Sequence, residues 1–322
     1  METKTGREET RMKPIKPKKL PCEIFVEYGI LKKAGSLLSP PGGGARRFLW
    51  LCDLPDTDPA PSALLASLEK AGQTVVPFPD GEYPDYPNDV DALLITGDAG
   101  KIGSAILFAD DHYPGLPYVL VPTTLEAQFD FAIGDAAGLI LCDPSLPVSD
   151  ADRKRATVEL IRYAVGFDAT LFDLLYADFD FGALLRRCLA IRCDLLDAEK
   201  TDLFDRLGTV IGLSVGYALG ARDPFADDPF DEADELAIGL AAATRYALKT
   251  GYCRKDFLSD LIGLLSYHGL PNSALISDEE LIAAIEEYPW ADGRNVISLP
   301  RRLGECGLVE FDPADLKGLL PN

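Results

Sequence analysis

The sequence predicts an α/β Rossmann-like domain followed by a mostly α-helical domain. Short apolar runs rich in β-branched and aromatic residues alternate with helical segments in the first half of the chain, a pattern typical of parallel sheets with helical connections. Long helical runs replace them after residue 144. The 322 residues, 47% of them hydrophobic, suffice for two cores. We expect a flexible basic tail over residues 1–20, the α/β domain over residues 21–147 and the helical domain over residues 148–322.

Six apolar runs predict the strands of the first domain. They cover residues 23–29, 46–53, 74–79, 89–97, 115–124 and 138–144. Residues 62–72 predict a helix that stops at a glycine, and the PPGGGARR stretch predicts a flexible connection between the first two strands. Most of these strands are continuously apolar and do not alternate in polarity, so we expect a parallel sheet covered by helices on both faces.

Helical spacing of apolar residues predicts the elements of the second domain. These segments cover residues 149–166, 181–220, 231–251 and 255–271. Ser149 or Asp150 is the expected N-cap of the first. The acidic, proline-broken stretch DPFADDPFD predicts a loop between two helices.

An apolar run from Leu207 to Ala221 carries glycine at every fourth position, in GLSVGYALG. The run is shorter than the about 20 residues that span a bilayer, so it predicts a buried helix. The glycine spacing clears one stripe of that helix, which either lets another backbone approach closely or leaves room for a bound group.

The net negative charge of the chain argues against polyanionic partners. The chain has 31 Lys and Arg against 52 Asp and Glu, a net charge of −21, which disfavours nonspecific binding to nucleic acid or to anionic membranes. The first twenty residues are instead basic and rich in proline. They lack the apolar segment of a secretory signal, so we expect a cytoplasmic protein.

Several segments, taken in order, resemble the 3-dehydroquinate synthase family. They include YVLVPTTLEAQFD, ATVELIRYAVGFDATLFDLL, GLSVGYALG and DEADELAIGLAAA. The resemblance covers nearly all of the chain after the tail. It implies a dehydroquinate synthase-like fold, a homodimer and an active site between the two domains. It also implies an enzyme that uses NAD and a divalent metal, usually zinc, to convert a phosphorylated seven-carbon sugar acid into 3-dehydroquinate, with loss of phosphate.

The metal positions implied by the resemblance are incompletely filled. The family's site needs one carboxylate and two imidazoles, and the matching positions are Glu159, Leu213 and Glu232. The only two histidines lie elsewhere: we expect His112 in a surface loop and His268 at a helix end. We therefore predict that the zinc site is lost and that Glu159 and Glu232 are its remnants. A carboxylate-only site for a harder ion such as magnesium is the alternative.

The cofactor positions implied by the resemblance are Gly97, Gly100, Lys101, Thr123 and Thr124. The turn ITGDAGKIGSA keeps glycines that would let backbone amides approach a pyrophosphate. Asp98, however, puts a carboxylate where the anion would lie, unless Lys101 compensates. After Gly134 the chain also lacks a long lysine-containing excursion that the family has. We predict that NAD is not bound.

The substrate positions implied by the resemblance are Asp130, Arg162, Arg192 and Arg206. Guanidinium groups bind carboxylates and phosphates well, so recognition of an anion could outlast catalysis. The alternative is that these arginines pair with the abundant acidic residues of neighbouring helices. Helical spacing further predicts that Arg206, Val210, Leu213 and Tyr217 share one face, which is mostly apolar.

The sequence thus predicts a dehydroquinate synthase-like protein with degraded zinc and NAD sites, inactive or of changed function, that binds a small anionic ligand or sugar phosphate. The alternative is a divergent active 3-dehydroquinate synthase or related sugar-phosphate cyclase, which would need NAD and a divalent metal. A scaffold partner for an intact paralogue is a third possibility that the sequence does not separate from the first. No other nucleophile or phosphate-loop motif is found.

Overall fold

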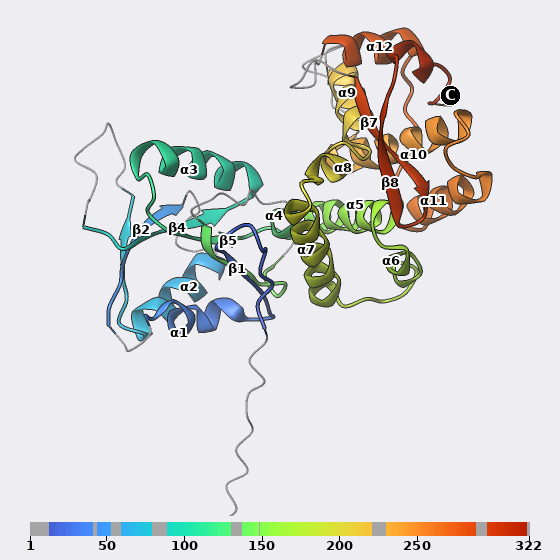
Figure 1. Ribbon diagram of the computed structural model, residues 1–322. Coiled ribbons are helices and arrows are strands. Elements are labelled where there is room, and N and C mark those ends of the chain that lie inside the picture. Colours follow the sequence, from blue (N-terminus) through green and yellow to red (C-terminus); the bar gives the residue numbers. More distant parts are fainter. Residues whose placement is uncertain are drawn as a thin grey trace, which may run out of the picture. The chain divides into compact units, whose positions relative to one another are not determined.

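The computed structural model describes residues 13–40, 44–52, 59–78, 89–129, 137–147, 149–220, 230–287 and 295–320. The chain divides into two compact units, Met1–Pro147 and Val148–Asn322 (Figure 1). None of the helices in these ranges is long and apolar enough to cross a membrane.

The first domain is built on a six-stranded parallel sheet with the order β1-β6-β5-β4-β2-β3. Its strands are β1 (Glu23–Val26), β2 (Arg47–Cys52), β3 (Thr74–Pro77), β4 (Ala92–Gly97), β5 (Tyr118–Pro122) and β6 (Ala137–Cys142). Its helices are η1 (Ile30–Lys33), α1 (Ala34–Leu38), α2 (Pro59–Lys70), α3 (Ala99–His112) and α4 (Leu125–Phe129). All six predicted strands are therefore present, and the predicted parallel arrangement is confirmed.

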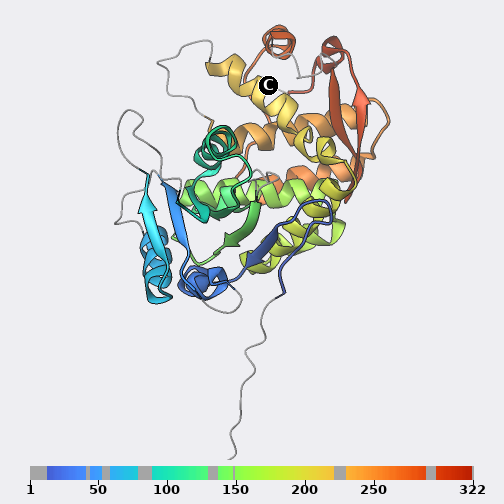
Figure 2. The same ribbon diagram turned by 60° about the vertical axis from the view of Figure 1, so that its left-hand side comes forward.

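Helices cover both faces of this sheet, with α3 on one side and α1 and α2 on the other (Figure 1; Figure 2). The α1–α2 face has a core in which Phe48, Trp50, Leu94 and Val121 of the strands pack with Leu64 of α2. The intervening strand residues point to the α3 face, because side chains alternate along a strand. Continuously apolar strands are thus explained by burial on both sides.

Part of the predicted basic tail is ordered. Ile15 and Ile24 of β1 exchange two backbone hydrogen bonds, each 2.9 Å long, and Lys16 forms an ion pair with Glu23. The prediction of a flexible tail over residues 1–20 therefore extends too far. Residues 1–12 lie outside the described residues.

The second domain consists of eight α-helices and a β-hairpin among the described residues. The helices are α5 (Asp150–Gly166), α6 (Ala169–Leu174), α7 (Phe181–Asp197), α8 (Thr201–Asp205), α9 (Thr209–Gly220), α10 (Glu232–Lys249), α11 (Lys255–Tyr267) and α12 (Asp278–Glu287). The hairpin is formed by β7 (Val296–Arg302) and β8 (Glu305–Glu310), and a short η2 (Pro313–Leu316) follows. The Ser149 hydroxyl accepts a hydrogen bond from the Asp152 amide, 3.0 Å away, which confirms Ser149 as the N-cap of α5.

The glycines of α9 let a second helix approach closely. A Cβ atom on Gly212 would lie 2.6 Å from the Glu235 carbonyl oxygen of α10, and one on Gly239 of α10 would lie 2.0 Å from the Gly208 carbonyl oxygen. Neither distance is compatible with a side chain, because backbone atoms cannot move away as a flexible side chain could. The close approach of another backbone, one of the two alternatives for this motif, is confirmed.

Two histidine predictions have different outcomes. His112 is the last residue of α3 rather than a loop residue, and its ring stacks on that of Phe108 with 4.2 Å between centroids; the loop prediction was wrong because the helix extends to this aromatic pair. His268 is the C-cap of α11, as expected. Burial nevertheless lowers its pKa below the ordinary 6.5, so a favourable charge at the helix terminus does not account for its position.

Candidate functional site

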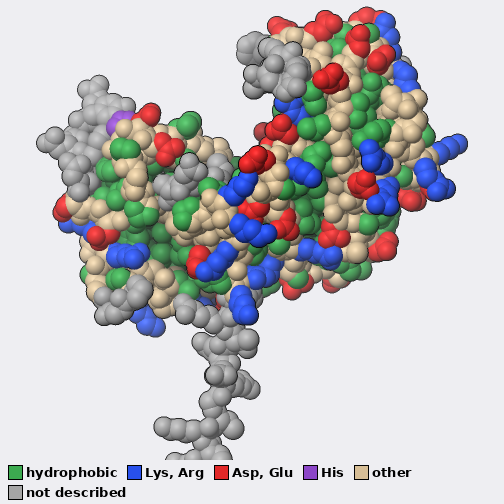
Figure 3. Space-filling model, viewed as in Figure 1, with side chains coloured by type: hydrophobic (Ala, Val, Ile, Leu, Met, Phe, Trp, Pro, Cys, Tyr) green, Lys and Arg blue, Asp and Glu red, His purple; other side chains and the backbone are tan. Residues whose placement is uncertain are grey.

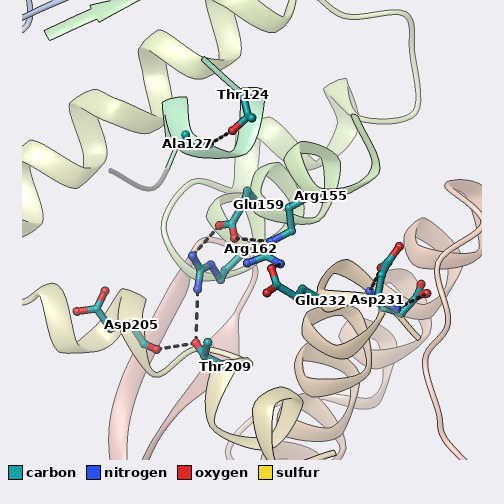
Figure 4. Close-up of polar contacts among 10 residues, drawn as sticks. Thr124, Ala127, Arg155, Glu159, Arg162, Asp205, Thr209, Asp231 and Glu232 are labelled. Carbon is teal, nitrogen blue, oxygen red and sulfur yellow. Dashed lines mark hydrogen bonds and ion pairs between the residues drawn. The ribbon is translucent and has the colours of Figure 1, made fainter. Parts of the chain in front are cut away.

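Glu159, the expected metal carboxylate, lies in the buried half of α5. Its side chain is 2% exposed, and its Oε2 accepts a hydrogen bond from Arg162 Nη2 at 2.6 Å. Arg155 lies one turn earlier, with its Nε 4.0 Å from Glu159 Oε1. Figure 4 shows the two guanidinium groups approaching the carboxylate from its two sides. A carboxylate this deeply buried needs such cations, because removing it from water alone is costly.

Arg162 is held within the second domain on several sides. Its side chain is 3% exposed, and besides Glu159 it donates a hydrogen bond of 3.4 Å to the Thr209 hydroxyl at the start of α9 (Figure 4). The guanidinium carbon lies 3.8 Å from the ring centroid of Phe204 in α8, within the range of a cation–π contact. To bind an anion from solvent, Arg162 would have to leave these partners.

Glu232, the second remnant position, lies at the first turn of α10. Arg155 forms an ion pair with it across the two helices, and the Glu232 side chain is 75% exposed. The Asp231 carboxylate caps α10 in a reciprocal capping box with Asp234. Lys154 Nζ lies 3.0 Å from Asp231 Oδ2 and 2.7 Å from Asp234 Oδ2. Two neighbouring cations of α5 thus bind the N-terminus of α10, where acidic side chains also favour the helix dipole.

The contact of Asp231 with Lys154 and the Asp234 amide shifts the pKa of Asp231. Burial by itself would raise that pKa, but the Asp234 amide and the Lys154 ammonium group stabilise the carboxylate, and the pKa is lowered. Lys154 has the complementary shift: burial opposes its charge, while its hydrogen bonds to Asp234 and Asp231 raise its pKa. The ion pairs between α5 and α10 therefore favour the charged forms of both partners.

The donors at the expected metal positions do not fit a zinc ion. Catalytic zinc requires three protein ligands. Glu159 is bound by Arg162, Glu232 is bound by Arg155, and Leu213 is a hydrocarbon side chain. Within the ranges that the structure describes, no group of three or more His, Cys, Asp and Glu side chains is arranged to hold a metal ion.

The face predicted for Arg206, Val210, Leu213 and Tyr217 is interrupted, because only the last three of these residues belong to α9. Gly208 adopts a left-handed conformation with φ of 79° and separates α8 from α9, so Arg206 is the C-cap of α8 and not part of α9. Val210 is fully buried, whereas Leu213 is 46% exposed. The prediction was wrong because a single helix was assumed across a glycine that ends one helix and starts another.

Arg192 and Arg206 contact the interior of the second domain. The Arg192 guanidinium carbon, on α7, lies 4.9 Å from the ring centroid of Phe204, the same ring that Arg162 contacts. Arg206 Nη1 donates a hydrogen bond of 3.3 Å to the Val296 carbonyl oxygen of β7. Phe204 was not identified from the sequence, although its position two residues before Arg206 is a signal that could have indicated it. The structure thus gathers two of the three predicted substrate arginines at one aromatic ring.

Side chains of both signs are interspersed with hydrophobic ones on the face shown in Figure 3. Of the predicted arginines, Arg162 pairs with an acidic residue, Glu159, which belongs to its own helix and not to a neighbouring one. Arg187, which was not among the predicted residues, lies 2.5 Å from Asp168.

The predicted cofactor turn lies between β4 and α3. Asp98 is the N-cap of α3, and its Oδ1 accepts a hydrogen bond of 2.9 Å from the Lys101 amide. Gly97 has a φ of 155°, and a Cβ there would lie 2.9 Å from Lys101 Cβ, so this position requires glycine. Thr123, the residue after β5, donates a hydrogen bond of 2.9 Å from its amide to the Gly97 carbonyl oxygen. The structure therefore brings Gly97, Lys101 and Thr123 together.

This helix N-terminus does not fit a diphosphate. The Asp98 carboxylate already binds an amide of the first turn, and its negative charge would repel an anion placed there. The Lys101 ammonium group lies 4.0 Å from Asp98 Oδ2 and thereby offsets that charge within the turn. Thr124 caps the short helix α4 through a 3.1 Å hydrogen bond from the Ala127 amide. Asp130 and the shortened segment after it lie outside the described residues.

A cavity of about 600 Å³ opens beside this turn. It is lined by Leu51, Phe78, Asp98, Gly100, Lys101, Ser104, Ala105 and Phe108. The rings of Phe78 and Phe108 meet edge to face, with 5.2 Å between centroids, and form an apolar wall. Its volume lies within the range of small-molecule sites. The sequence identified Gly100 and Lys101, but the apolar wall comes from a strand end and a helix that only folding brings together.

Comparisons with known proteins agree with this fold. No protein-family model matches the chain. It is 24% identical to the 3-dehydroquinate synthase of Desulforamulus reducens over 349 residues, which cover 92% of this chain and 96% of that protein. It is 26% identical to that of Buchnera aphidicola over 212 residues, but this match spans only 59% of the relative's length.

Solved structures share this fold over most of the chain. The 2-epi-5-epi-valiolone synthase ValA of Streptomyces hygroscopicus, with NAD+ and Zn2+ bound, has a TM-score of 0.75 at 18% identity and covers 94% of this chain and 96% of its own. A 2-deoxy-scyllo-inosose synthase complexed with carbaglucose-6-phosphate, NAD+ and Co2+ has a TM-score of 0.72 at 14% identity, with coverages of 94% and 97%. The chain is therefore related to the 3-dehydroquinate synthase family and has the dehydroquinate synthase-like fold of the sugar-phosphate cyclases.

Proposed function

We propose that this chain is a dehydroquinate synthase-like protein that does not perform the zinc- and NAD-dependent ring-forming reaction and acts by binding a ligand. The observation that carries the proposal is the buried pair of Glu159 and Arg162, 2.6 Å apart. The carboxylate that the family resemblance assigns to the metal is neutralised within the domain. A zinc ion at this carboxylate would face the guanidinium groups of Arg162 and Arg155, both of which repel it.

Two further features support the loss of the parent chemistry. Leu213 offers no lone pair at the position where the resemblance implies an imidazole, and Asp98 opposes a diphosphate at the N-terminus of α3. A reaction that begins with transient oxidation of an alcohol needs both the metal ion and NAD in place, and these residues fit neither.

The cavity beside α3 is the best-supported place for a ligand. The walls formed by Phe78 and Phe108 favour an apolar or ring-shaped body. Lys101 lines the same cavity and would contact a single anionic group on that body. The expected ligand is therefore a small monoanion with an apolar part. Since Asp98 lies next to Lys101, a diphosphate is disfavoured.

An active cyclase is the second candidate, and the comparisons favour it. The nearly full-length match to a 3-dehydroquinate synthase and the fold shared with cyclases that bind NAD+ and a divalent metal support this reading. It requires Glu159 to exchange Arg162 for a metal ion. It also requires further ligands that the resemblance does not supply.

Metal analysis and thermal unfolding distinguish the two candidates. The full chain is purified without chelator, its zinc content is measured, and its melting temperature is recorded with and without NAD and zinc. Binding to the folded state alone raises the melting temperature by mass action. We expect substoichiometric zinc and no shift, whereas the Desulforamulus reducens synthase serves as the positive control. One zinc per chain together with an NAD-dependent shift would refute the proposed function.

A homodimer and a cytoplasmic location belong to the same proposal, and a scaffold role for an intact paralogue is a third, separate possibility. Light scattering after gel filtration measures the first, and co-purification with the paralogue measures the third.

A further inference from the structure

Arg155 occupies an unusual position between the two remnant carboxylates. It is on α5, one turn before Glu159, and its Nε lies 4.0 Å from Glu159 Oε1. The same guanidinium group forms an ion pair with Glu232 at the first turn of α10. One side chain thus links the carboxylate inside α5 to the carboxylate on the neighbouring helix (Figure 4).

We infer that Arg155 is a built-in cation that holds the two remnant carboxylates and replaces a metal ion as the link between α5 and α10. Removing it should create a weak two-carboxylate site for a hard divalent cation. The inference rests on the proposed function, because it assumes that no metal occupies this place in the native protein.

The chemistry of arginine suits this role. A guanidinium group is charged at every pH at which the protein is folded, and its several N–H donors can serve two carboxylates at once. Unlike a metal ion, it cannot be removed by a chelator. Glu159 is deeply buried and already paired with Arg162, and the charge of Arg155 is balanced by Glu232, so the two guanidinium groups together neutralise the two carboxylates.

The two-carboxylate site expected after removal of Arg155 should bind a cation weakly, because its two carboxylates differ in exposure. Glu159 is fixed by packing, whereas the Glu232 side chain is 75% exposed and can adjust its position once Arg155 is absent. Two carboxylates with several water molecules suit Mn2+ or Mg2+ better than zinc. Arg162 remains beside Glu159 and limits the affinity.

Lys154 provides a matched control. It precedes Arg155 in α5 and carries the same charge, and it also contacts the N-terminus of α10, but through Asp231 and Asp234. Lys154→Ala therefore weakens the contact between the same two helices and leaves Arg155 with Glu159 and Glu232.

The experiment titrates Mn2+ into the full chain and measures calorimetric binding and the melting temperature. The variants are Arg155→Ala, Arg155→Met, Lys154→Ala and the double variant Arg155→Ala with Glu159→Gln. We expect both Arg155 variants to bind one Mn2+ at least tenfold more tightly than wild type and to gain about 2–4 °C at saturating Mn2+. Wild type and Lys154→Ala should gain nothing, and the double variant should lose the effect.

Equal Mn2+ binding by wild type and the Arg155 variants would overturn the inference, as would no stabilisation of either variant. If both variants fail to fold without metal, refolding in Mn2+ supports the inference and its failure refutes it. Turnover by the wild-type chain without any metal would refute the proposed function and leave the role of Arg155 standing. The two failures are therefore distinguishable.

Discussion

Breaking the buried pair between Glu159 and Arg162 should destabilise the second domain strongly. At an effective dielectric constant of about 20, unit charges 2.6 Å apart attract by about 6 kcal/mol. Removing each ion from water costs several kcal/mol, so the pair as a whole contributes little net free energy. Glu159→Gln, however, leaves Arg162 buried with less compensating charge. We expect it to lower the free energy of unfolding by about 3–5 kcal/mol.

Urea unfolding followed by circular dichroism measures this loss. Glu232→Gln is the matched control, because it removes an exposed partner of an ion pair and should cost at most about 1 kcal/mol. The double variant Glu159→Gln with Arg162→Met removes both charges and should be more stable than Glu159→Gln alone. A cost below about 1 kcal/mol for Glu159→Gln, or additive costs in the double variant, would refute the reasoning.

Three further predictions concern other parts of the chain. Gly212→Ala or Gly239→Ala should lower the free energy of unfolding by more than about 2 kcal/mol, because the added Cβ meets backbone atoms. Gly103→Ala is the control: a Cβ there meets nothing within 4 Å, so it should stabilise α3 by about 0.4–1 kcal/mol. Equal effects of the three substitutions in denaturant titrations would contradict this. Asp98→Asn keeps an N-cap acceptor but removes the charge, so it should tighten the binding of ADP measured by calorimetry, and weaker binding would argue against repulsion at this turn. Burial lowers the pKa of His268 below 6.5, so the unfolded chain takes up the proton at a higher pH than the folded chain does. The free energy of unfolding should therefore fall as the pH drops below 6.5. His268→Gln should flatten this pH dependence, and an unchanged pH profile in that variant would exclude His268 as its source.

The sheet and the main helices could be predicted because their signals are local. Strands buried on both faces are continuously apolar, and Ser149 starts α5 with a side-chain cap that short-range pattern reveals. The glycine stripe likewise predicted a close helix contact, although the partner helix carrying Gly239 could not be identified. The strands, the helix cap and the glycine stripe are each determined by residues close together in the sequence or by a regular spacing along one helix.

The hairpin of β7 and β8 was missed for a physical reason. Its second strand is only partly buried, and Leu308 is exposed, so no continuous apolar run indicates a strand there. Gly304, with φ of 77°, forms the turn and packs against Ala169, a residue distant in sequence. Such a hairpin is stabilised by tertiary contacts that local pattern does not reveal.

Glu159, Arg162 and Glu232 were named from the sequence, whereas Arg155 and the contacts among these residues were not. Arg155, Glu159 and Arg162 are spaced by four and three residues, which places them on one helix face and could have predicted their pairing. Glu232 joins them only because α10 folds against α5. The cavity at Phe78 and Phe108 depends similarly on elements that are distant in the sequence.

The most direct test of the central claim is the release of phosphate from the phosphorylated seven-carbon sugar acid by the purified full chain, supplied with NAD and zinc. The Desulforamulus reducens synthase, measured in parallel, establishes that the assay works. Arg162 neutralises Glu159, and Leu213 and the Arg155-bound Glu232 do not complete a set of three zinc ligands, so the account predicts no release above the enzyme-free blank. NAD-dependent release of phosphate that a chelator abolishes would contradict it.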